Sequence, residues 1–281
     1  MEKVYIVTDS TAGIPKELVE NNRIKILPLS IEFEGNIYRD GIDIDEETLL
    51  LMLDKGEELP KTSQVNPNGF YDQYEELIKE GYKIISIHLS SELSGTYQSA
   101  CIARNMFEKK EDIFVVDSKG VSFATGALVQ EATKMLGSGM AIEAIVARLN
   151  ELASKVKVAF AVDNLEYIRK GGRISSVHAA IGTLLNIKPM LSMKDGKIDV
   201  YDKVRGRKKA LKSLLEYVKE GNPNTDLTFA IGNVGAESDM YAFKDSLSKE
   251  GIINDTQTVS VGSVIATYSG PGTIGVFFFE Q

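Results

Sequence analysis

The stretch SSELSGTY at residues 90–97 is the strongest candidate for a binding site, because four of its first seven residues carry hydroxyl groups. An apolar run at residues 83–89 predicts a buried strand before it, and a broad apolar face after it predicts a helix. Such a strand-to-helix loop favours anions, because unpaired N–H groups and the helix dipole point at the ligand. Ser94 and Thr96 would add uncharged O–H donors, and Gly95 would let a ligand approach the backbone. We therefore predict an anion site here; the alternative is a simple helix cap at Ser94.

A second group of uncharged donors, Thr62, Ser63 and Gln64, lies in a segment bounded by Pro60 and Pro67. Proline fixes the backbone angle φ, so prolines at both ends would suit a loop that is held rigid for binding. The alternative is a loop that is polar only because it is exposed.

Two further predicted strands end in the same dipeptide, Asp9-Ser10 and Asp117-Ser118. A metal- or phosphate-dependent transferase or phosphatase acting on a small molecule would use carboxylates placed in this way. The alternative is structural, because Asp and Ser side chains at such positions form turns and cap the next helix, and we favour it. The sequence contains no P-loop, no G-x-S-x-G motif and no metal-ligand spacing, which predicts no metal site.

Positive charge is concentrated at residues 205–209, RGRKK, in a chain whose formal net charge is -8. Most runs of this kind form a solvated face, and the sharper alternative is a docking module for an acidic partner. The acidic balance of the chain argues against non-specific binding of nucleic acid, which needs a basic surface. We therefore expect no nucleic-acid partner; salt-sensitive binding to nucleic acid would contradict this expectation.

The bulk composition is that of an ordinary globular protein, with 281 residues, 43% hydrophobic and 26% charged. No apolar run reaches the length of a membrane span, and the N-terminus leads directly into a strand pattern. We therefore expect neither stable membrane insertion nor a signal peptide. The single cysteine, Cys101, excludes an internal disulfide and is typical of a reducing compartment. These features predict a cytoplasmic protein.

Strands alternate with helices along the first half of the chain, which predicts a doubly wound, mostly parallel sheet with its ligand site at the carboxyl ends of the strands. The predicted strands lie near residues 4–8, 24–33, 83–89 and 112–116, and Pro28 interrupts the second of them. A second region begins near Val158 and contains a predicted hairpin around Asp195-Gly196. The expected fold class is therefore α/β, with an N-terminal domain at residues 1–157 and a C-terminal mixed α/β domain at residues 158–281.

A G-x-G-x-x-G pattern occupies residues 270–275, near the end of the chain. A dinucleotide site needs a helix directly after these glycines, and no helical pattern follows here. We interpret Gly270-Pro271-Gly272 as a turn that leads into a final strand, and we expect no dinucleotide cofactor.

Taken together, these pieces resemble the DegV family of fatty acid-binding proteins, which includes the lipid-carrying subunits of bacterial fatty acid kinase. The resemblance covers essentially the full length, and it is specific because several motifs occur in the family's order. The matching motifs are VTDSTAGIP (7–15), KTSQ (61–64), SSELSGTY (90–97), VVDS (115–118), LEYIRKGGRI (165–174), RGRKKAL (205–211) and TYSGPGTIG (267–275).

The resemblance implies a two-domain DegV-like fold that holds a long-chain fatty acid between its domains. It also implies that Thr62 and Ser94 hold the carboxylate, close to the backbone of Gly95. Arg173 and Arg205 are expected near the mouth, where the catalytic subunit of a fatty acid kinase engages and phosphorylates the acyl carboxylate. By the same resemblance the protein is a lipid carrier rather than an enzyme, with no catalytic residues and no cofactor besides the bound lipid.

Tyr268 departs from the family, which usually carries histidine at this position of the segment ATYSGPG (266–272). Histidine can change charge between about pH 5 and 8, whereas tyrosine offers a single O–H donor. We expect Tyr268 to donate to the carboxylate, and we expect the fatty acid affinity to be nearly independent of pH. The alternative places the ring against the Gly-Pro-Gly turn, away from the ligand.

Overall fold

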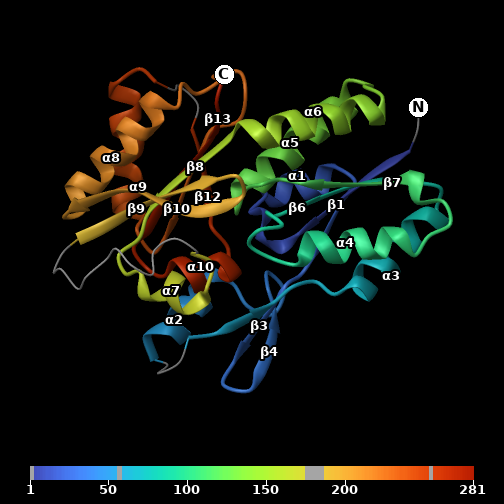
Figure 1. Cartoon of the computed structure of the whole chain (residues 1–281), viewed down its shortest axis with the longest axis horizontal. Coiled ribbons are helices and arrows are strands. Elements are labelled where there is room, and N and C mark those ends of the chain that lie inside the picture. The colour runs from blue at the N-terminus through green and yellow to red at the C-terminus, as the bar shows by residue number, and fades with distance from the viewer. Residues whose placement is uncertain (1–2, 56–58, 175–186, 253–255) are drawn as a thin grey trace.

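The computed structural model describes residues 3–55, 59–174, 187–252 and 256–281, whose strands form two large sheets and one small one (Figure 1). The strands are β1 (Val4–Asp9), β2 (Ile24–Leu27), β3 (Ser30–Phe33), β4 (Asn36–Arg39), β5 (Lys61–Ser63), β6 (Lys83–His88), β7 (Ile113–Asp117), β8 (Val156–Ala161), β9 (Ile187–Lys194), β10 (Lys197–Arg205), β11 (Ala230–Val234), β12 (Gln257–Ser260) and β13 (Thr273–Phe279). The α-helices are α1 (Lys16–Asn21), α2 (Glu46–Lys55), α3 (Pro67–Lys79), α4 (Thr96–Asn105), α5 (Phe123–Gly137), α6 (Ile142–Lys155), α7 (Glu166–Gly171), α8 (Arg207–Glu220), α9 (Glu237–Lys249) and α10 (Ser263–Ser269), and short 3-10 helices lie at Ser10–Ala12 and Lys110–Asp112.

The first sheet is entirely parallel in its described part, with the strand order β2-β1-β6-β7. Its strands are apolar runs because helices cover both faces. On one face, Leu128 of α5 and Ile145 of α6 share a core with Ile85 of β6. On the other face, Phe70 of α3 packs in the same core as Ile84. These contacts confirm the doubly wound parallel sheet that the sequence predicts.

The second sheet is mixed, with the strand order β10-β9-β8-β13-β11-β12 over the described residues. Its hairpin, β9–β10, turns at Asp195 and Gly196, which both have positive φ angles, as the predicted two-residue turn requires. Helices α8 and α9 lie on one face of this sheet, on the left of Figure 1. The mixed sheet confirms the predicted class of the C-terminal region. The predicted boundary between residues 157 and 158 falls inside β8 and stays a prediction.

The structure confirms one local expectation and corrects another, each for a physical reason. The expected interruption at Pro28 divides residues 24–33 into two strands, because the chain leaves the parallel sheet there and β3 joins β4 and β5 in a small antiparallel sheet. The segment around Thr62 was expected to be a loop, and it contains β5 because it pairs with β3. Arg205 is the last residue of β10, and α8 begins at Arg207. In addition, α10 was not predicted at all.

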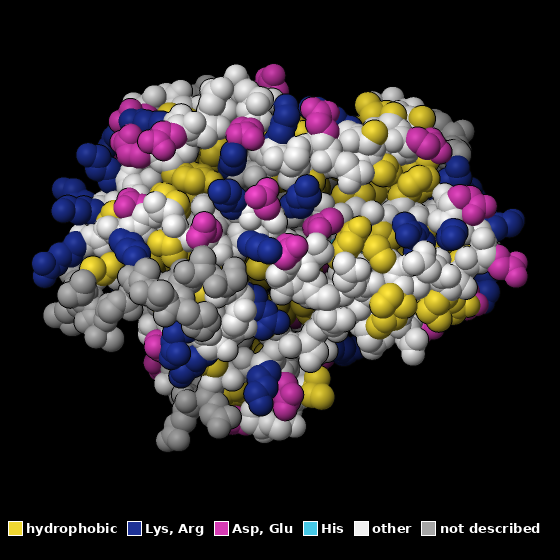
Figure 2. All heavy atoms as spheres, viewed as in Figure 1, with side chains coloured by type: hydrophobic (Ala, Val, Ile, Leu, Met, Phe, Trp, Pro, Cys, Tyr) yellow, Lys and Arg dark blue, Asp and Glu magenta, His cyan; other side chains and the backbone are white. Residues whose placement is uncertain are grey.

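Charges of both signs are interspersed on the face that Figure 2 shows. Lys and Arg side chains gather at the left edge of this face, over α8, and apolar side chains gather at the right, over α3 and α4. Two of the most exposed apolar residues, Ile102 and Met106, belong to α4 and the residue that follows it. Among the described helices, none is long and apolar enough to cross a membrane.

Candidate functional site

A cavity of about 330 Å³ lies where the carboxyl ends of the parallel strands meet the six-stranded sheet. Its apolar wall comes from alternate residues of two neighbouring strands, Val158 and Phe160 on β8 and Gly275 and Phe277 on β13. The residues between them, such as Val276, pack beneath α8 and α9 on the opposite face. The two-residue period of a strand therefore gives one face of this sheet to the cavity and the other to the helices.

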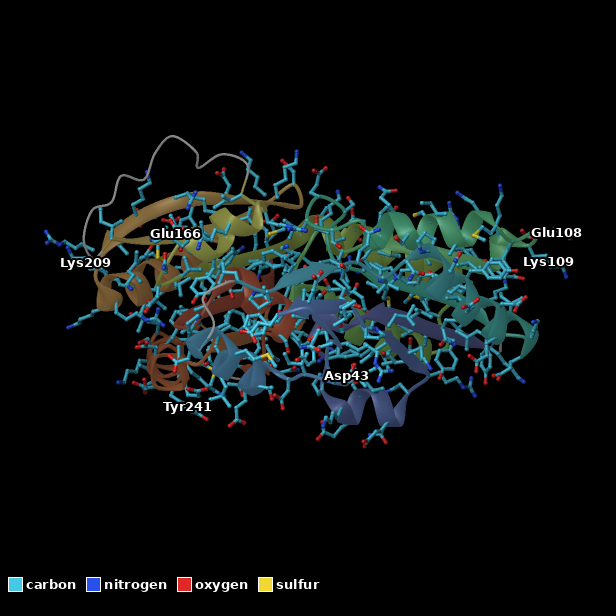
Figure 3. The ribbon with its side chains drawn as sticks, turned by 90° about the horizontal axis from the view of Figure 1, so that it is seen from below. Asp43, Glu108, Lys109, Glu166, Lys209 and Tyr241 are labelled. Carbon is cyan, nitrogen blue, oxygen red and sulfur yellow. The ribbon has the colours of Figure 1, made fainter. Side chains whose placement is uncertain are left out.

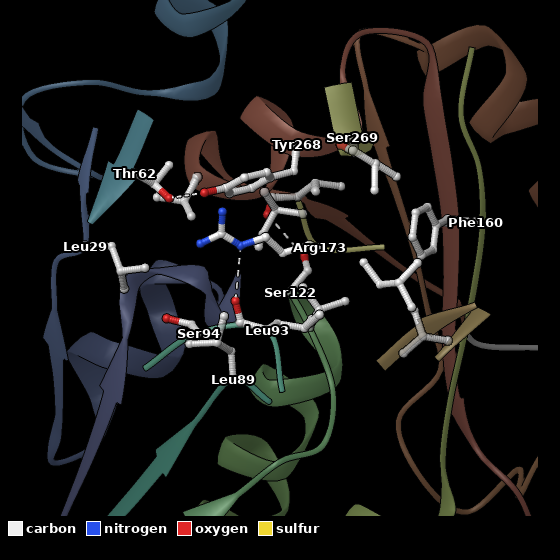
Figure 4. A pocket seen from close by; sticks show the side chains of 18 of the residues that line it. Leu29, Thr62, Leu89, Leu93, Ser94, Ser122, Phe160, Arg173, Tyr268 and Ser269 are labelled. Carbon is white, nitrogen blue, oxygen red and sulfur yellow. Dashed lines mark hydrogen bonds between the residues drawn. The ribbon is translucent and has the colours of Figure 1, made fainter. Parts of the chain in front are cut away.

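The opposite end of the cavity is polar, and it brings together the residues predicted to hold a carboxylate. Gly95 lines it, together with Thr62, Ser94 and Tyr268 (Figure 4). Thr62 comes from β5, where it pairs with Ile31 of β3, and Tyr268 comes from α10. The Thr62 and Tyr268 hydroxyls are hydrogen-bonded to each other. One cavity thus brings together the four residues that the sequence analysis proposed for a carboxylate, and their role toward a ligand stays a prediction.

The hydroxyl-rich loop before α4 has two functions, and only part of it faces the cavity. Ser94 lines the cavity while its Oγ accepts a hydrogen bond from the Thr96 N–H at 3.2 Å, so it also organises the helix start. Ser90 is buried and donates to the Gly196 carbonyl at 2.7 Å, and Ser91 donates to Asp117 at 2.6 Å. These two serines fix the loop and are not donors to the cavity.

Gln64 is a lining residue whose importance the sequence analysis missed. Its side-chain nitrogen donates to Ser99 of α4 at 2.9 Å, and its Oε1 would lie 2.0 Å from a Cβ built on Gly95. Gly95 is therefore needed because Gln64 packs directly on its backbone, and this contact joins β5 to the start of α4. The only signal in the sequence was the presence of Gln64 beside Thr62.

The ring of Tyr268 is held between two residues of the segment at the end of α7. The Arg173 guanidinium carbon lies 4.7 Å from the ring centroid, and a Cβ on Gly171 would lie 2.2 Å from Cδ1 of the ring. The Gly-Pro-Gly turn is packed by a different tyrosine, since Tyr167 would be 2.5 Å from a Cβ on Gly270. Tyr268 therefore faces the cavity and does not lie against the turn.

A second, outer cleft of about 510 Å³ lies beside the polar end and shares Thr62, Arg173 and Tyr268 with the cavity. Lys61 and Lys170 also line this cleft. Arg173 is exposed, and it donates to the Leu93 carbonyl at 3.4 Å and to the Gly171 carbonyl at 2.6 Å. Arg173 therefore stands between the cavity and the outer cleft, whereas Arg205 lines neither of them.

The basic segment 205–209 is not one continuous patch. Arg207 turns inward, where it pairs with Asp239 at 2.8 Å and donates to the Gly272 carbonyl at 2.7 Å. Lys209 instead points away from α8 into solvent, at the far end from Glu108 (Figure 3). Arg207 thus binds the turn that follows α10. Its positive charge is paired there, so the segment 205–209 offers less positive charge to an acidic partner.

The two Asp-Ser strand ends are used for structure. Asp9 is fully buried and accepts hydrogen bonds from Thr11 and from the Leu89 N–H, and it contacts His88 Nδ1 at 3.0 Å. Asp117 accepts from the backbone N–H groups of Ser91 and Lys119. In the described ranges, no group of three or more His, Cys, Asp or Glu residues could hold a metal ion. The hydrogen bonds of Asp9 and Asp117 to nearby backbone N–H groups therefore agree with a structural role for both carboxylates.

His88 extends this buried network without reaching the cavity. Its Nε2 contacts Ser86 Oγ at 2.6 Å, and the Tyr74 hydroxyl donates to the same oxygen at 2.6 Å. Burial raises the pKa of Tyr74, against a smaller opposing effect of its hydrogen bond with Ser86. The chain Asp9–His88–Ser86 has the residue types of a hydrolase triad, but all three side chains are buried away from the cavity lining. We interpret it as a rigid support for the loop that follows β6.

Asp40 is a buried carboxyl at the junction of the small sheet with α10. Burial raises its pKa, and hydrogen bonds from Ser10, Ser263 and the Val264 backbone oppose the rise. Its Oδ2 atom has no hydrogen-bond partner among the described residues. Asp40, which directly follows β4, therefore links the 3-10 helix at Ser10–Ala12 to α10, and α10 carries Tyr268.

The comparisons with known proteins agree with this arrangement. Residues 3–281 match the DegV family model, and the chain belongs to this family. A DegV domain-containing protein of Clostridium acetobutylicum is 39% identical over 281 residues, which is 100% of both chains.

Solved structures show the same fold. A DegV family protein from Thermus thermophilus, described by its fatty acid binding, has a TM-score of 0.93 and 32% identity, covering 99% of this chain and 100% of its own. A stearic acid-binding protein from Eubacterium ventriosum has a TM-score of 0.88 and 30% identity, covering 100% of this chain and 98% of its own. The two-domain DegV fold expected from the sequence is therefore confirmed.

Proposed function

We propose that this protein binds a long-chain fatty acid in the cavity and presents its carboxylate to the catalytic subunit of a fatty acid kinase. One observation carries the proposal: a single cavity has uncharged hydroxyl donors at one end, among them Thr62, Ser94 and Tyr268, and an apolar strand wall at the other. The fatty acid and stearic acid binding of the Thermus and Eubacterium relatives supports the same ligand class.

The energetics favour this ligand. Burying an acyl chain contributes about 0.8 kcal/mol per methylene, and ordering the chain offsets part of that gain. A buried carboxylate costs several kcal/mol unless it is hydrogen-bonded. Hydroxyl donors and the N-terminus of α4 satisfy it without a buried cation, and they leave its oxygens available for phosphoryl transfer.

The position of the outer cleft supports presentation to a partner. Thr62 and Tyr268 line both spaces, so a carboxylate held by them would be reached from the cleft. Lys61, Lys170 and Arg173 give the cleft a positive lining that suits a phosphate group. The protein then supplies no catalytic residue of its own, and the kinase supplies the chemistry. No observation favours a metal-dependent reaction at Asp9 or Asp117.

Extraction of the gently purified protein with organic solvent, followed by mass spectrometry, tests the proposal. We expect about one long-chain fatty acid per chain, and we expect a cognate kinase with ATP to convert it to the acyl phosphate. Lipid-free protein that also takes up no added fatty acid would contradict binding. If the protein carries a fatty acid that the cognate kinase fails to phosphorylate, fatty acid binding would stand and presentation to a kinase would be contradicted.

A further inference from the structure

Ser269 places an unpartnered hydroxyl on the wall of the cavity. The side chain is only 5% exposed, and its Oγ has no hydrogen-bond partner among the described residues. Its neighbours on the same segment behave differently, because Thr267 donates back to the Ser263 carbonyl at 3.0 Å and Thr273 donates to the Ser269 carbonyl at 2.9 Å. A buried hydroxyl normally finds a partner, so this exception points to a group inside the cavity.

Ser122 provides a second hydroxyl on the same wall. It is 1% exposed, and its φ angle of 54° and ψ angle of -135° lie in a region that serine rarely adopts. Its Oγ donates to the Val261 carbonyl at 3.2 Å, which leaves its lone pairs free to accept a hydrogen bond. Figure 4 shows Ser122 and Ser269 between the Thr62–Tyr268 pair and Phe160. The cavity lining thus contains two hydroxyls, those of Ser122 and Ser269, that are separate from the predicted carboxylate donors.

We propose that Ser269 and Ser122 recognise a polar substituent on the acyl chain, so that the preferred ligands include long-chain fatty acids carrying a hydroxyl group. A chain hydroxyl would accept a hydrogen bond from Ser269 and donate one to Ser122. An unsubstituted chain would leave Ser269 unpaired, which lowers affinity for that ligand relative to a substituted one. This inference rests on the proposed function, because it assumes that the cavity holds a fatty acid.

Competition binding with delipidated protein tests the inference. Stearate and a positional series of hydroxystearates are compared by their displacement of a fluorescent fatty acid. We expect at least one hydroxystearate to bind about tenfold more tightly than stearate, which corresponds to about 1.4 kcal/mol. In Ser269→Ala the ratio of hydroxystearate affinity to stearate affinity should fall to about one, while the affinity for stearate stays unchanged.

Two further variants separate recognition from a general effect on the cavity. Ser122→Gly removes the second hydroxyl, glycine accepts the positive φ angle, and the ratio should fall there as well. Ser63→Ala removes a hydroxyl that lines the polar end of the same cavity, and the ratio should stay near ten. Equal affinity for stearate and every hydroxystearate, or an unchanged ratio in Ser269→Ala, would overturn the inference while leaving fatty acid binding intact. Failure of all these acids to bind would overturn the proposed function itself.

Discussion

The Tyr268 hydroxyl is hydrogen-bonded to the Thr62 hydroxyl, although 206 positions of the chain separate the two residues. The bond joins α10 to β5, and it lies where the cavity meets the outer cleft. In the proposed complex, the ligand carboxylate would accept a hydrogen bond from each of the two hydroxyls, and these bonds would replace the one between them. The pair therefore keeps two donors side by side before the ligand arrives, which reduces the cost of organising the site.

Replacing the proposed donors should weaken binding in a non-additive way. Thr62→Ala and Ser94→Ala should each cost about 1.5–3 kcal/mol of fatty acid affinity, the range for a hydrogen bond to a charged group. The double variant should lose less than the sum, because both side chains share one acceptor. Calorimetric titration with palmitate measures all three. Unchanged dissociation constants in both single variants would show that the carboxylate does not bind at this end of the cavity.

A methyl group on Gly171 should disturb the site through Tyr268. Gly171→Ala would bring a Cβ to 2.2 Å from the Tyr268 ring, so the ring must shift and its hydrogen bond with Thr62 is disturbed. We expect fatty acid affinity to fall about tenfold, or about 1.4 kcal/mol, as it should in Tyr268→Phe. Gly137→Ala is the matched control, because Gly137 is also the last residue of a helix and has open space around it. Equal affinity in the Gly171 and Gly137 variants would show that the ring position does not matter.

The two arginines expected at the mouth should separate lipid carriage from presentation. Arg173→Ala should retain the fatty acid and lose phosphorylation by a cognate kinase, measured as acyl phosphate formed per minute. The same result is expected of Arg205→Ala on the family resemblance alone, since Arg205 lines neither the cavity nor the outer cleft. Arg148→Ala, on α6, removes an arginine that pairs with Glu151 and should keep both properties. Loss of lipid from folded Arg173→Ala would instead show that this residue holds the carboxylate.

Stability should depend on pH through Asp40. Burial raises the pKa of this carboxyl above its ordinary value of 3.8, so its contribution to stability is full below that pH and is lost as the pH rises through the folded-state pKa. Asp40→Asn should abolish this loss, so denaturant unfolding followed in steps from about pH 4 to about pH 8 should show a smaller decline than in the unmodified protein. Asp43→Asn should leave the decline unchanged, because Arg39 lowers the pKa of Asp43 to about 2, below this window. A decline that survives in Asp40→Asn would assign it to another group.

The strands and the lining residues were largely predictable, because they rest on local patterns. Apolar runs gave the parallel strands, and Asp195-Gly196 gave the hairpin. Thr62, Ser94 and Gly95 were found because uncharged donors were concentrated in two short motifs and because those motifs resemble the family.

The elements that were missed depend on contacts between distant parts of the chain. The strand β5 has three residues and forms because it pairs with β3. The helix α10 has seven residues and lies between Gly262 and Gly270, which both have positive φ angles. The stacking of Arg173 on Tyr268 and the need for Gly171 arise from packing between α7 and α10, which sequence spacing does not encode.

The central claim is that one cavity holds both an acyl chain and its carboxylate, and titration of delipidated protein with palmitate and with its methyl ester tests it most directly. The ester has the same chain, but it cannot accept the charge-assisted hydrogen bonds from Thr62, Ser94 and Tyr268. We predict that palmitate binds at one per chain and that the ester binds at least tenfold more weakly. Equal affinity for the two ligands, or no saturable binding of palmitate, would contradict the account.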